Sequence, residues 1–344
     1  MALSETELQR LPAWLARELA AERVTVANVR RLGGGAIQEN IALDLAVEGG
    51  PKAGAHALVL RRDSPSTVAV SRPRLEEYAI LERVYRAGAT VPAPFLACAD
   101  PEVLGKPFYL VARVEGEARG ARLVKDPLVR ARGEELVARL GRELATIHAL
   151  RPPLPDLPFL RPPEGDPVRV RIAELRAHLD ALDAAEPVLE WGLRFVERRA
   201  PESREIALVH GDFRTGNLVV RDGRLVAVLD WEFAGFSDPL EDLGWMLAKC
   251  WRFGAIEREC GGLGSREAFL RSYEEASGRV VDRRAVRFWE LVATLRWAVV
   301  ALMQADRHAS GRERSLELAL TAHIVPRLEA DVLDYVALLE EAEP

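Results

Sequence analysis

Residues 208–242 read LVHGDFRTGNLVVRDGRLVAVLDWEFAGFSDPLED and contain a compact set of acids and an amide. Asp212 stands near the start, Asn217 follows five residues later, and Asp230 ends an apolar run that is typical of a strand. Phosphoryl transfer needs one carboxylate that orients the acceptor hydroxyl and takes its proton, together with oxygen ligands for Mg²⁺. The pattern therefore predicts Asp212 as the base, and Asn217 and Asp230 as the metal ligands.

The segments HGDFRTGN and LDWEFAGFSDPLEDLGW resemble the signatures of the aminoglycoside phosphotransferase and choline kinase superfamily. The likeness points most to a branch that includes kinase domains attached to some acyl-CoA dehydrogenases. It implies an α+β, two-lobed, protein-kinase-like fold. A small antiparallel-sheet N-lobe would occupy residues 1–114, and a larger, mostly helical C-lobe would occupy residues 115–344. The resemblance also implies ATP as the phosphoryl donor and Mg²⁺ as the cofactor.

Bulk composition narrows the class of partner. The 344 residues carry a net charge of −6 with acids and bases interspersed, which argues against a nucleic-acid surface. The sequence has no apolar run of about 18 residues, and its first residues lack a basic start followed by an apolar signal core. We therefore expect a cytoplasmic protein without a nucleic-acid or membrane partner. The resemblance implies a small-molecule hydroxyl substrate, and the protein is expected as a monomer or a homodimer.

A glycine loop lies between two expected strands of the N-lobe. Residues 24–32 and 41–47 alternate apolar and polar side chains, which predicts antiparallel strands. Gly33, Gly34 and Gly35 separate them, and backbone amides there can approach phosphate oxygens without Cβ obstruction. A plain hairpin turn is the alternative. The position well upstream of the catalytic segment favours a phosphate-binding loop.

The next strand of the resembled family ends in a basic residue that holds nucleotide phosphates and pairs with a helix carboxylate. That place falls on Arg61, with Arg62 as the alternative. Glu77 is the expected partner, and Glu76 is the second choice. Arginine replaces the usual lysine, so the charge is kept while a planar fork replaces a point charge. A solvated charge pair is the plainer alternative.

The run FYLVARVEG at residues 108–116 resembles the family's hinge. Backbone atoms of Ala112 and Val114 would bind the adenine edge there, whereas a simple core strand is the alternative. The sequence leaves the choice between ATP and GTP open. The break at Gly116 predicts the end of the small lobe.

Other polar residues of the catalytic segment take supporting roles by the same resemblance. We expect His210 to brace the loop rather than to act as a base. Arg214 lies inside the loop and would approach the transferring phosphate, with a surface arginine as the alternative. The residues expected beside the metals and the loop backbone are Glu232, Asp238 and Asp242.

The C-terminal region would bind the acceptor. Residues 128–150, 283–309 and 315–339 are predicted as helices, with arginines and tryptophans distributed among acids. These side chains favour an anionic or partly apolar acceptor, such as a hydroxyacyl-CoA, although solvated arginines and core tryptophans are the plainer explanation. An aminoglycoside, sugar or amino-alcohol kinase is an alternative. A catalytically inactive, nucleotide-binding protein is the alternative of another class.

Overall fold

The computed structural model describes residues 3–33, 38–63, 71–182, 185–203 and 205–341. The chain divides into two compact units, residues 1–115 with 229–233, and residues 116–228 with 234–344. A five-stranded sheet dominates the first unit and helices dominate the second, which confirms the α+β class and its antiparallel-sheet and helical parts. The predicted lobes, residues 1–114 and 115–344, were also expected to bind the nucleotide and the acceptor. Both the limits and these binding roles stay predictions.

The sheet of the first unit is antiparallel throughout. Its strands pair in the order β1 (Arg23–Arg31), β2 (Gln38–Glu48), β3 (Gly54–Asp63), β5 (Phe108–Ala112) and β4 (Pro94–Cys98). Successive side chains of a strand point to opposite faces, so Ile41, Leu43 and Leu45 of β2 lie together in the core. The alternation in the sequence therefore predicts the buried face of this strand correctly.

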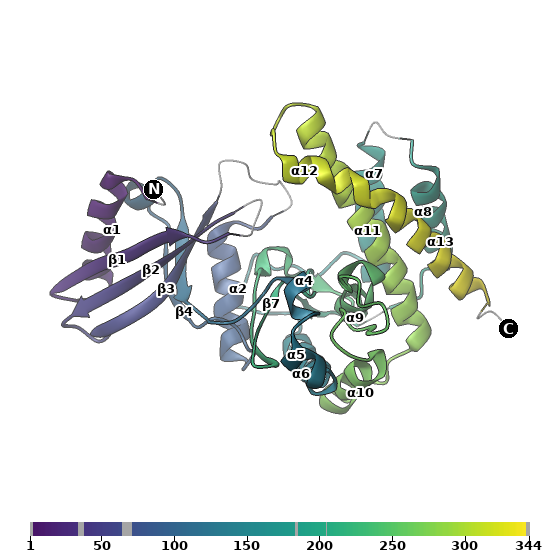
Figure 1. Cartoon of the computed structure of the whole chain (residues 1–344), viewed down its shortest axis with the longest axis horizontal. Helices are drawn as coiled ribbons and strands as arrows, with labels where there is room; N and C mark the ends of the chain where they lie inside the picture. Colours follow the sequence, from purple (N-terminus) through teal and green to yellow (C-terminus); the bar gives the residue numbers. More distant parts are fainter. Residues whose placement is uncertain (1–2, 34–37, 64–70, 183–184, 204, 342–344) are drawn as a thin grey trace. The chain divides into compact units, whose positions relative to one another are not determined.

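Helix α1 (Glu5–Glu18) covers part of this sheet and lies beside β1 in Figure 1. Ser4 begins the helix with a capping box, accepting from the Glu7 amide while the Glu7 carboxylate accepts from the Ser4 amide. Trp14 packs edge-on against Phe108 at a centroid distance of 5.2 Å. The first unit also contains α2 (Arg74–Arg86), α3 (Pro101–Leu104) and the short 3₁₀ helix η1 (Trp231–Phe233).

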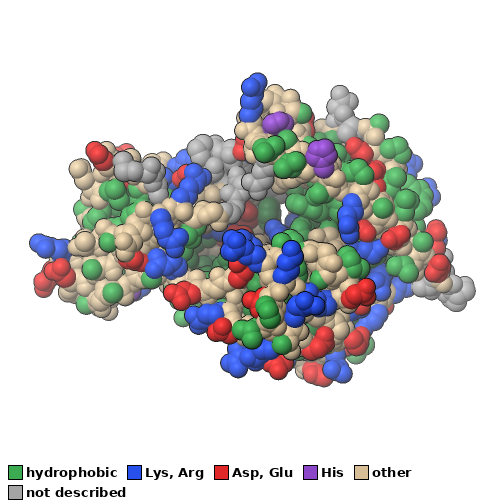
Figure 2. All heavy atoms as spheres, in the orientation of Figure 1, with side chains coloured by type: hydrophobic (Ala, Val, Ile, Leu, Met, Phe, Trp, Pro, Cys, Tyr) green, Lys and Arg blue, Asp and Glu red, His purple; other side chains and the backbone are tan. Residues whose placement is uncertain are grey.

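Helix α11 (Arg283–Ala309) forms the centre of the second unit, and Figure 1 shows it among the other long helices. Its Phe288, Leu291 and Leu295 belong to the main helical core. The other helices of this unit are α4 (Gly120–Leu123), α5 (Pro127–Ala131), α6 (Gly133–His148), α7 (Pro167–Asp180), α8 (Pro187–Arg199), α9 (Leu240–Leu247), η2 (Lys249–Trp251), α10 (Arg266–Ser277), α12 (Leu316–Thr321), η3 (Ala322–Ile324) and α13 (Val325–Glu341). Acidic and basic side chains are intermingled on the visible face of this unit (Figure 2).

Two predicted helices are interrupted, so their expected bounds are wrong. The helix expected at 128–150 is divided into α5 and α6 at Arg132, where Gly133 packs so tightly that a Cβ would lie 2.2 Å from the Leu263 carbonyl oxygen. The helix expected at 315–339 is divided into α12, η3 and α13. Pro326 lies at the start of α13, where a residue without an N–H is tolerated but cannot continue a preceding helix.

Candidate active site

The catalytic loop predicted from the sequence, residues 210–217, connects two short strands of the second unit. Strand β6 (Ala207–Val209) pairs with β9 (Gly235–Ser237), and β7 (Leu218–Arg221) pairs with β8 (Arg224–Val228). The loop begins as β6 ends and finishes as β7 begins. Gly211 and Gly216 have φ angles of +76° and +117°, which residues other than glycine rarely adopt. The two glycines let the chain turn sharply on either side of Asp212.

Asp242 on α9 holds the backbone at the start of this loop. Its Oδ2 accepts from the His210 amide at 2.7 Å, and its Oδ1 accepts from the Gly211 amide at 2.9 Å. His148 of α6 contacts the same carboxylate at 3.1 Å through Nε2. Burial alone would raise the pKa of Asp242, but the hydrogen bond and charge of His148, with the bond from His210, hold the pKa below its usual value. Asp242 therefore stays ionised and keeps both amides bound.

Both oxygens of the Asp212 carboxylate have defined partners. Oδ1 accepts from Trp245 Nε1 at 2.8 Å and from Arg214 Nε at 3.0 Å, and Oδ2 accepts from Asn217 Nδ2 at 2.6 Å. The same Asn217 nitrogen also donates to the Asp212 carbonyl oxygen at 3.0 Å. With the amide nitrogen turned to Asp212, the amide oxygen of Asn217 is the end of that side chain that can bind a metal.

His210 is fully buried beneath the loop. Its Nδ1 accepts from the Asp212 amide at 3.1 Å, and its ring meets Phe213 edge-on at 5.9 Å. These contacts fit the expected bracing role better than a role as base.

In the first unit, Arg61 near the end of β3 joins two carboxylates that are far apart in sequence. Its Nη1 donates to Asp230 Oδ1 at 2.5 Å, and its Nη2 lies 3.1 Å from Glu77 Oε1. Arg62 instead donates to Glu39 at 2.8 Å and to Glu7. Alternation along β3 thus puts Arg61 in the cluster with the predicted metal ligand and puts its neighbour elsewhere.

Arg61 is a permanently charged group of this cluster. Burial by itself lowers the pKa of its guanidinium, but the negative charges of Glu77 and Asp230 outweigh burial, so the pKa lies above its usual value. Glu76, the second-choice partner, pairs with Arg72 at 3.4 Å. The described contacts therefore favour Glu77.

Arg74 is a further member of the cluster that sequence reasoning missed. It is 1% exposed, forms an ion pair with Glu77, and lies 3.0 Å from Asp63 and 3.7 Å from Glu232. Its Nη2 donates to Ser71 Oγ at 2.6 Å. The spacing of three residues between Arg74 and Glu77 at the start of a helix was the available signal.

Glu232 of η1, expected near the metals, accepts a hydrogen bond from Gln38, which begins β2 after the glycine loop. Its Oε2 accepts from Gln38 Nε2 and from Ser71 Oγ, each at 2.6 Å. Burial raises the pKa of Glu232 above its usual value, although the Ser71 hydroxyl opposes this. Of the three loop glycines, Gly33 is described and exposed, whereas Gly34 and Gly35 lie outside the described residues.

The remaining predicted residues have the following positions. Ala112 ends β5 opposite Leu58, and Val114 lies two residues beyond it. Asp238 accepts from the Leu240 amide at 2.7 Å at the start of α9. Burial raises the pKa of Asp238 to about 6.

The donor chemistry of Asp230 and Asn217 suits Mg²⁺. Both offer oxygen atoms, and this ion commonly takes one or two protein ligands while phosphates and water complete its shell. Asp230 has a φ of +64°, a conformation in which aspartate is among the tolerated residues, and its side chain is 35% exposed. Among the described residues, no three His, Cys, Asp or Glu side chains form a metal-binding cluster. A metal held partly by substrate phosphates does not need one.

A family model described as "Phosphotransferase enzyme family" matches residues 28–289. The chain belongs to this family. This phosphotransferase is 25% identical over 295 residues to acyl-CoA dehydrogenase family member 11 of Pongo abelii, covering 80% of the chain and 37% of that relative. It is 28% identical over 196 residues to family member 10 of Mus musculus, covering 55% of the chain and 18% of that relative. The chain thus corresponds to only part of these longer proteins.

Solved structures confirm the kinase-like fold of this phosphotransferase. A candidate aminoglycoside phosphotransferase from Ralstonia eutropha JMP134 matches with a TM-score of 0.71 and 19% identity, over 98% of this chain and 99% of that one. A choline/ethanolamine kinase family protein from Mesorhizobium loti matches with a TM-score of 0.60 and 18% identity, over 92% and 93% of the two chains. Identities this low support the shared fold and nothing finer.

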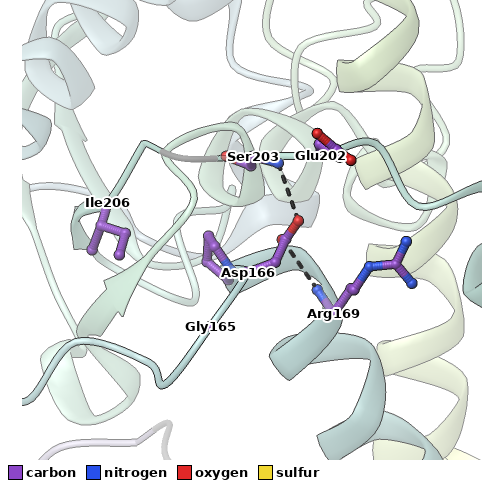
Figure 3. Close-up of a pocket in the computed structure, with 7 residues that line it drawn as sticks. Gly165, Asp166, Arg169, Glu202, Ser203 and Ile206 are labelled. Atoms are coloured by element: carbon purple, nitrogen blue, oxygen red, sulfur yellow. Dashed lines mark hydrogen bonds between the residues drawn. The ribbon is translucent and has the colours of Figure 1, made fainter.

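Two further observations concern the surface of this phosphotransferase. Within the described ranges, no helix is both long and apolar enough to cross a membrane. Figure 3 shows a hollow at the start of α7, where Asp166 accepts from the amides of Ser203 at 3.3 Å and Arg169 at 3.4 Å. The described residues that line it include none of the predicted site residues, so we assign no acceptor to this hollow.

Proposed function

We propose that this phosphotransferase moves the γ-phosphoryl group of ATP to a hydroxyl group of a small molecule. The observation that supports it most is the Asp212 carboxylate, which Trp245, Arg214 and Asn217 hold in one orientation within the loop. A base held in this way can align a hydroxyl and accept its proton as the oxygen attacks phosphorus.

The other residues have complementary roles in this proposal. Asn217 and Asp230 hold Mg²⁺, which when bound neutralises charge on the phosphates. Arg61 binds phosphate oxygens while Glu77 orients it, and the backbone of residues 33–35 covers the triphosphate. Backbone atoms of Ala112 and Val114 bind the adenine edge. Arg214 approaches the transferring group from within the catalytic loop.

Nucleotide binding has indirect support from relatives of the same fold. Structures of aminoglycoside phosphotransferase APH(4)-Ia hold AMP-PNP or ADP together with hygromycin B, and another aminoglycoside phosphotransferase holds GDP. These ligands belong to those proteins. They make Mg²⁺-ATP and Mg²⁺-GTP the first nucleotides to test with this chain.

For the acceptor, we propose an anionic or partly apolar hydroxyl compound such as a hydroxyacyl-CoA. The Arg214 guanidinium lies over the Trp251 ring at 4.5 Å and the Arg296 guanidinium over the Trp245 ring at 4.6 Å, both next to the Asp212 loop. Cations backed by flat apolar rings suit an acceptor that combines charge with hydrocarbon. The similarity to acyl-CoA dehydrogenase family members points to the same class.

The test combines thermal stability in Mg²⁺-ATP or Mg²⁺-GTP with phosphate transfer to separate pools of hydroxyacyl-CoAs, sugars, amino alcohols and aminoglycosides. Nucleotide-dependent stabilisation with transfer to the first pool is expected. Transfer only to another pool would refute the acceptor class and keep the kinase chemistry. Stabilisation without transfer to any pool would favour a nucleotide-binding protein without turnover. The ion pair between Arg61 and Asp230 supports this alternative, because it occupies the carboxylate that we propose as a metal ligand.

A further inference from the structure

Helix α9 contacts the catalytic loop at two residues that share one helix face. Asp242 binds the backbone amides of His210 and Gly211, and Trp245, three residues later, binds the Asp212 side chain. Residues three apart on a helix are neighbours. One rigid element therefore holds both the loop backbone and the carboxylate that we propose as the base.

The side chains of Trp251 and Arg296 pack against the Trp245 ring and hold its orientation. It is 4% exposed, packs 5.3 Å from the Trp251 ring, and lies under the Arg296 guanidinium. Arg296 of α11 also donates to the Gly211 carbonyl oxygen at 2.9 Å. Gly244 lets α9 approach α11 closely, because a Cβ at this position would lie 2.4 Å from Trp289 Cβ. The indole thus has little freedom to turn away from Asp212.

The pattern of donors distinguishes the two oxygens of Asp212. Each carboxylate oxygen accepts about two hydrogen bonds. Trp245 and Arg214 occupy Oδ1, whereas Oδ2 accepts from the Asn217 side chain and keeps a second acceptor direction. Oδ2 is therefore the oxygen that an incoming hydroxyl can use.

We propose that Trp245 is a positioning residue for phosphoryl transfer, whose indole N–H occupies Oδ1 of Asp212 and presents Oδ2 to the acceptor hydroxyl. This inference rests on the proposed function. In the step, the hydroxyl O–H bond breaks and its proton passes to Oδ2. The freed oxygen pair forms the new bond to the γ-phosphorus, and the bond from that phosphorus to the β–γ bridging oxygen breaks.

Trp289 is a matched control outside the proposed site. It is 1% exposed, and its buried Nε1 has no hydrogen-bond partner among the described residues. Trp245→Phe and Trp289→Phe therefore make the same chemical change at two buried positions. Only the first removes a hydrogen bond to the proposed base.

The experiment measures kcat and the KM for ATP of the whole chain and both variants, with the acceptor pool that the wild type phosphorylates. Trp245→Phe should lower kcat about 10- to 100-fold, as loss of an outer-shell partner often does, with an unchanged KM for ATP. Trp289→Phe should stay within about threefold of the wild type. Equal losses of kcat in the two variants, or a change confined to KM, would overturn the positioning role.

A second readout needs no turnover. In ¹⁵N-tryptophan-labelled protein, the seven indole N–H signals can be followed, and the Trp245 signal is the one lost in Trp245→Phe. Asp212→Asn should move that signal more than the other six, and an unmoved signal would overturn the contact. A wild type that binds Mg²⁺-ATP but transfers phosphate to no pool would instead overturn the proposed function, and the positioning role with it.

Discussion

The catalytic loop of the second unit and the arginine cluster of the first unit hold their carboxylates in different ways. Asp212 and Asp242 accept mainly from uncharged donors, namely backbone amides, an indole and a carboxamide, although Arg214 also donates to Asp212 and His148 contacts Asp242. Asp230 and Glu77 are held by the guanidinium groups of Arg61 and Arg74. Fixed neutral donors keep a carboxylate in one place without adding charge. Ion pairs can exchange partners when a charged phosphate or metal arrives.

This difference separates two tasks of the proposed reaction. The loop must be ready before the substrate arrives, because preorganised groups cost no rearrangement during the chemical step. In the proposed reaction the arginine cluster binds a highly charged nucleotide. Before the nucleotide and its metal bind, the buried carboxylates of the cluster need cations as partners. Substitutions that change one donor type at a time should show whether the two sites behave in this way.

The largest effect is expected at the proposed base. Asp212→Asn keeps the shape of the side chain but removes the charge that accepts the proton, so turnover should fall by about two to four orders of magnitude. Binding of Mg²⁺-ATP, followed by thermal stabilisation, should change little. Asp222→Asn in the β7–β8 turn is the control and should retain activity. Equal activity of the two variants would contradict the assignment of the base.

The next effect tests the ion-pair cluster. Arg74→Met removes a buried cation from Glu77 and leaves that buried carboxylate with Arg61 as its remaining ion-pair partner, so the free energy of unfolding should fall by about 3 to 5 kcal/mol. Arg72→Met, at a more exposed arginine paired with Glu76, should cost less than about 1 kcal/mol. Urea unfolding measures both. Similar losses would show that burial of the cation is unimportant.

Asp238 should make stability depend on pH in a direction opposite to Asp242. Its folded pKa of about 6 exceeds the ordinary 3.8, so its favourable contribution is present below about pH 4 and is lost as the pH rises through about 6. Two pKa units correspond to about 3 kcal/mol as an upper value. Asp238→Asn should therefore flatten the stability profile between these pH values and stabilise the protein above pH 6. An unchanged profile would contradict the buried, protonated state.

The pH behaviour of Asp242 provides the contrasting measurement. Its folded pKa lies below the ordinary value, so its contribution is present above that value and is lost only as the pH falls below it. Asp242→Asn should lower the free energy of unfolding near neutral pH, whereas Asp238→Asn should raise it. The opposite signs are the expected result in urea unfolding at neutral pH.

The smallest effect is expected for Arg61→Lys. Lysine keeps the positive charge but cannot contact Glu77 and Asp230 through two arms of a planar fork. Activity should fall no more than about tenfold, with most of the change in the KM for ATP. Arg61→Met should lose far more. If Arg61→Lys and Arg61→Met lose activity equally, the geometry of the guanidinium rather than its charge decides the role of Arg61.

Much of this description follows from local sequence. The order Asp212, Asn217, Asp230 predicts phosphoryl-transfer chemistry because that reaction needs those groups and a short hairpin can connect them. Period-two alternation predicts the buried face of β2, and the helix expected at 283–309 matches α11. Local signals failed where packing overrides propensity, as in the breaks near Arg132 and before Pro326.

The sequence by itself determined the family, the fold class and the candidate residues of the catalytic segment, because these depend on residue types at short spacings. Only the tertiary structure decided that Arg61 rather than Arg62 joins Asp230, and that Trp245 and Arg296 bind the catalytic loop. Those contacts join residues 33 to 169 positions apart. No local pattern encodes such pairs, since they arise when helices and strands pack and each buried polar group has to find a partner.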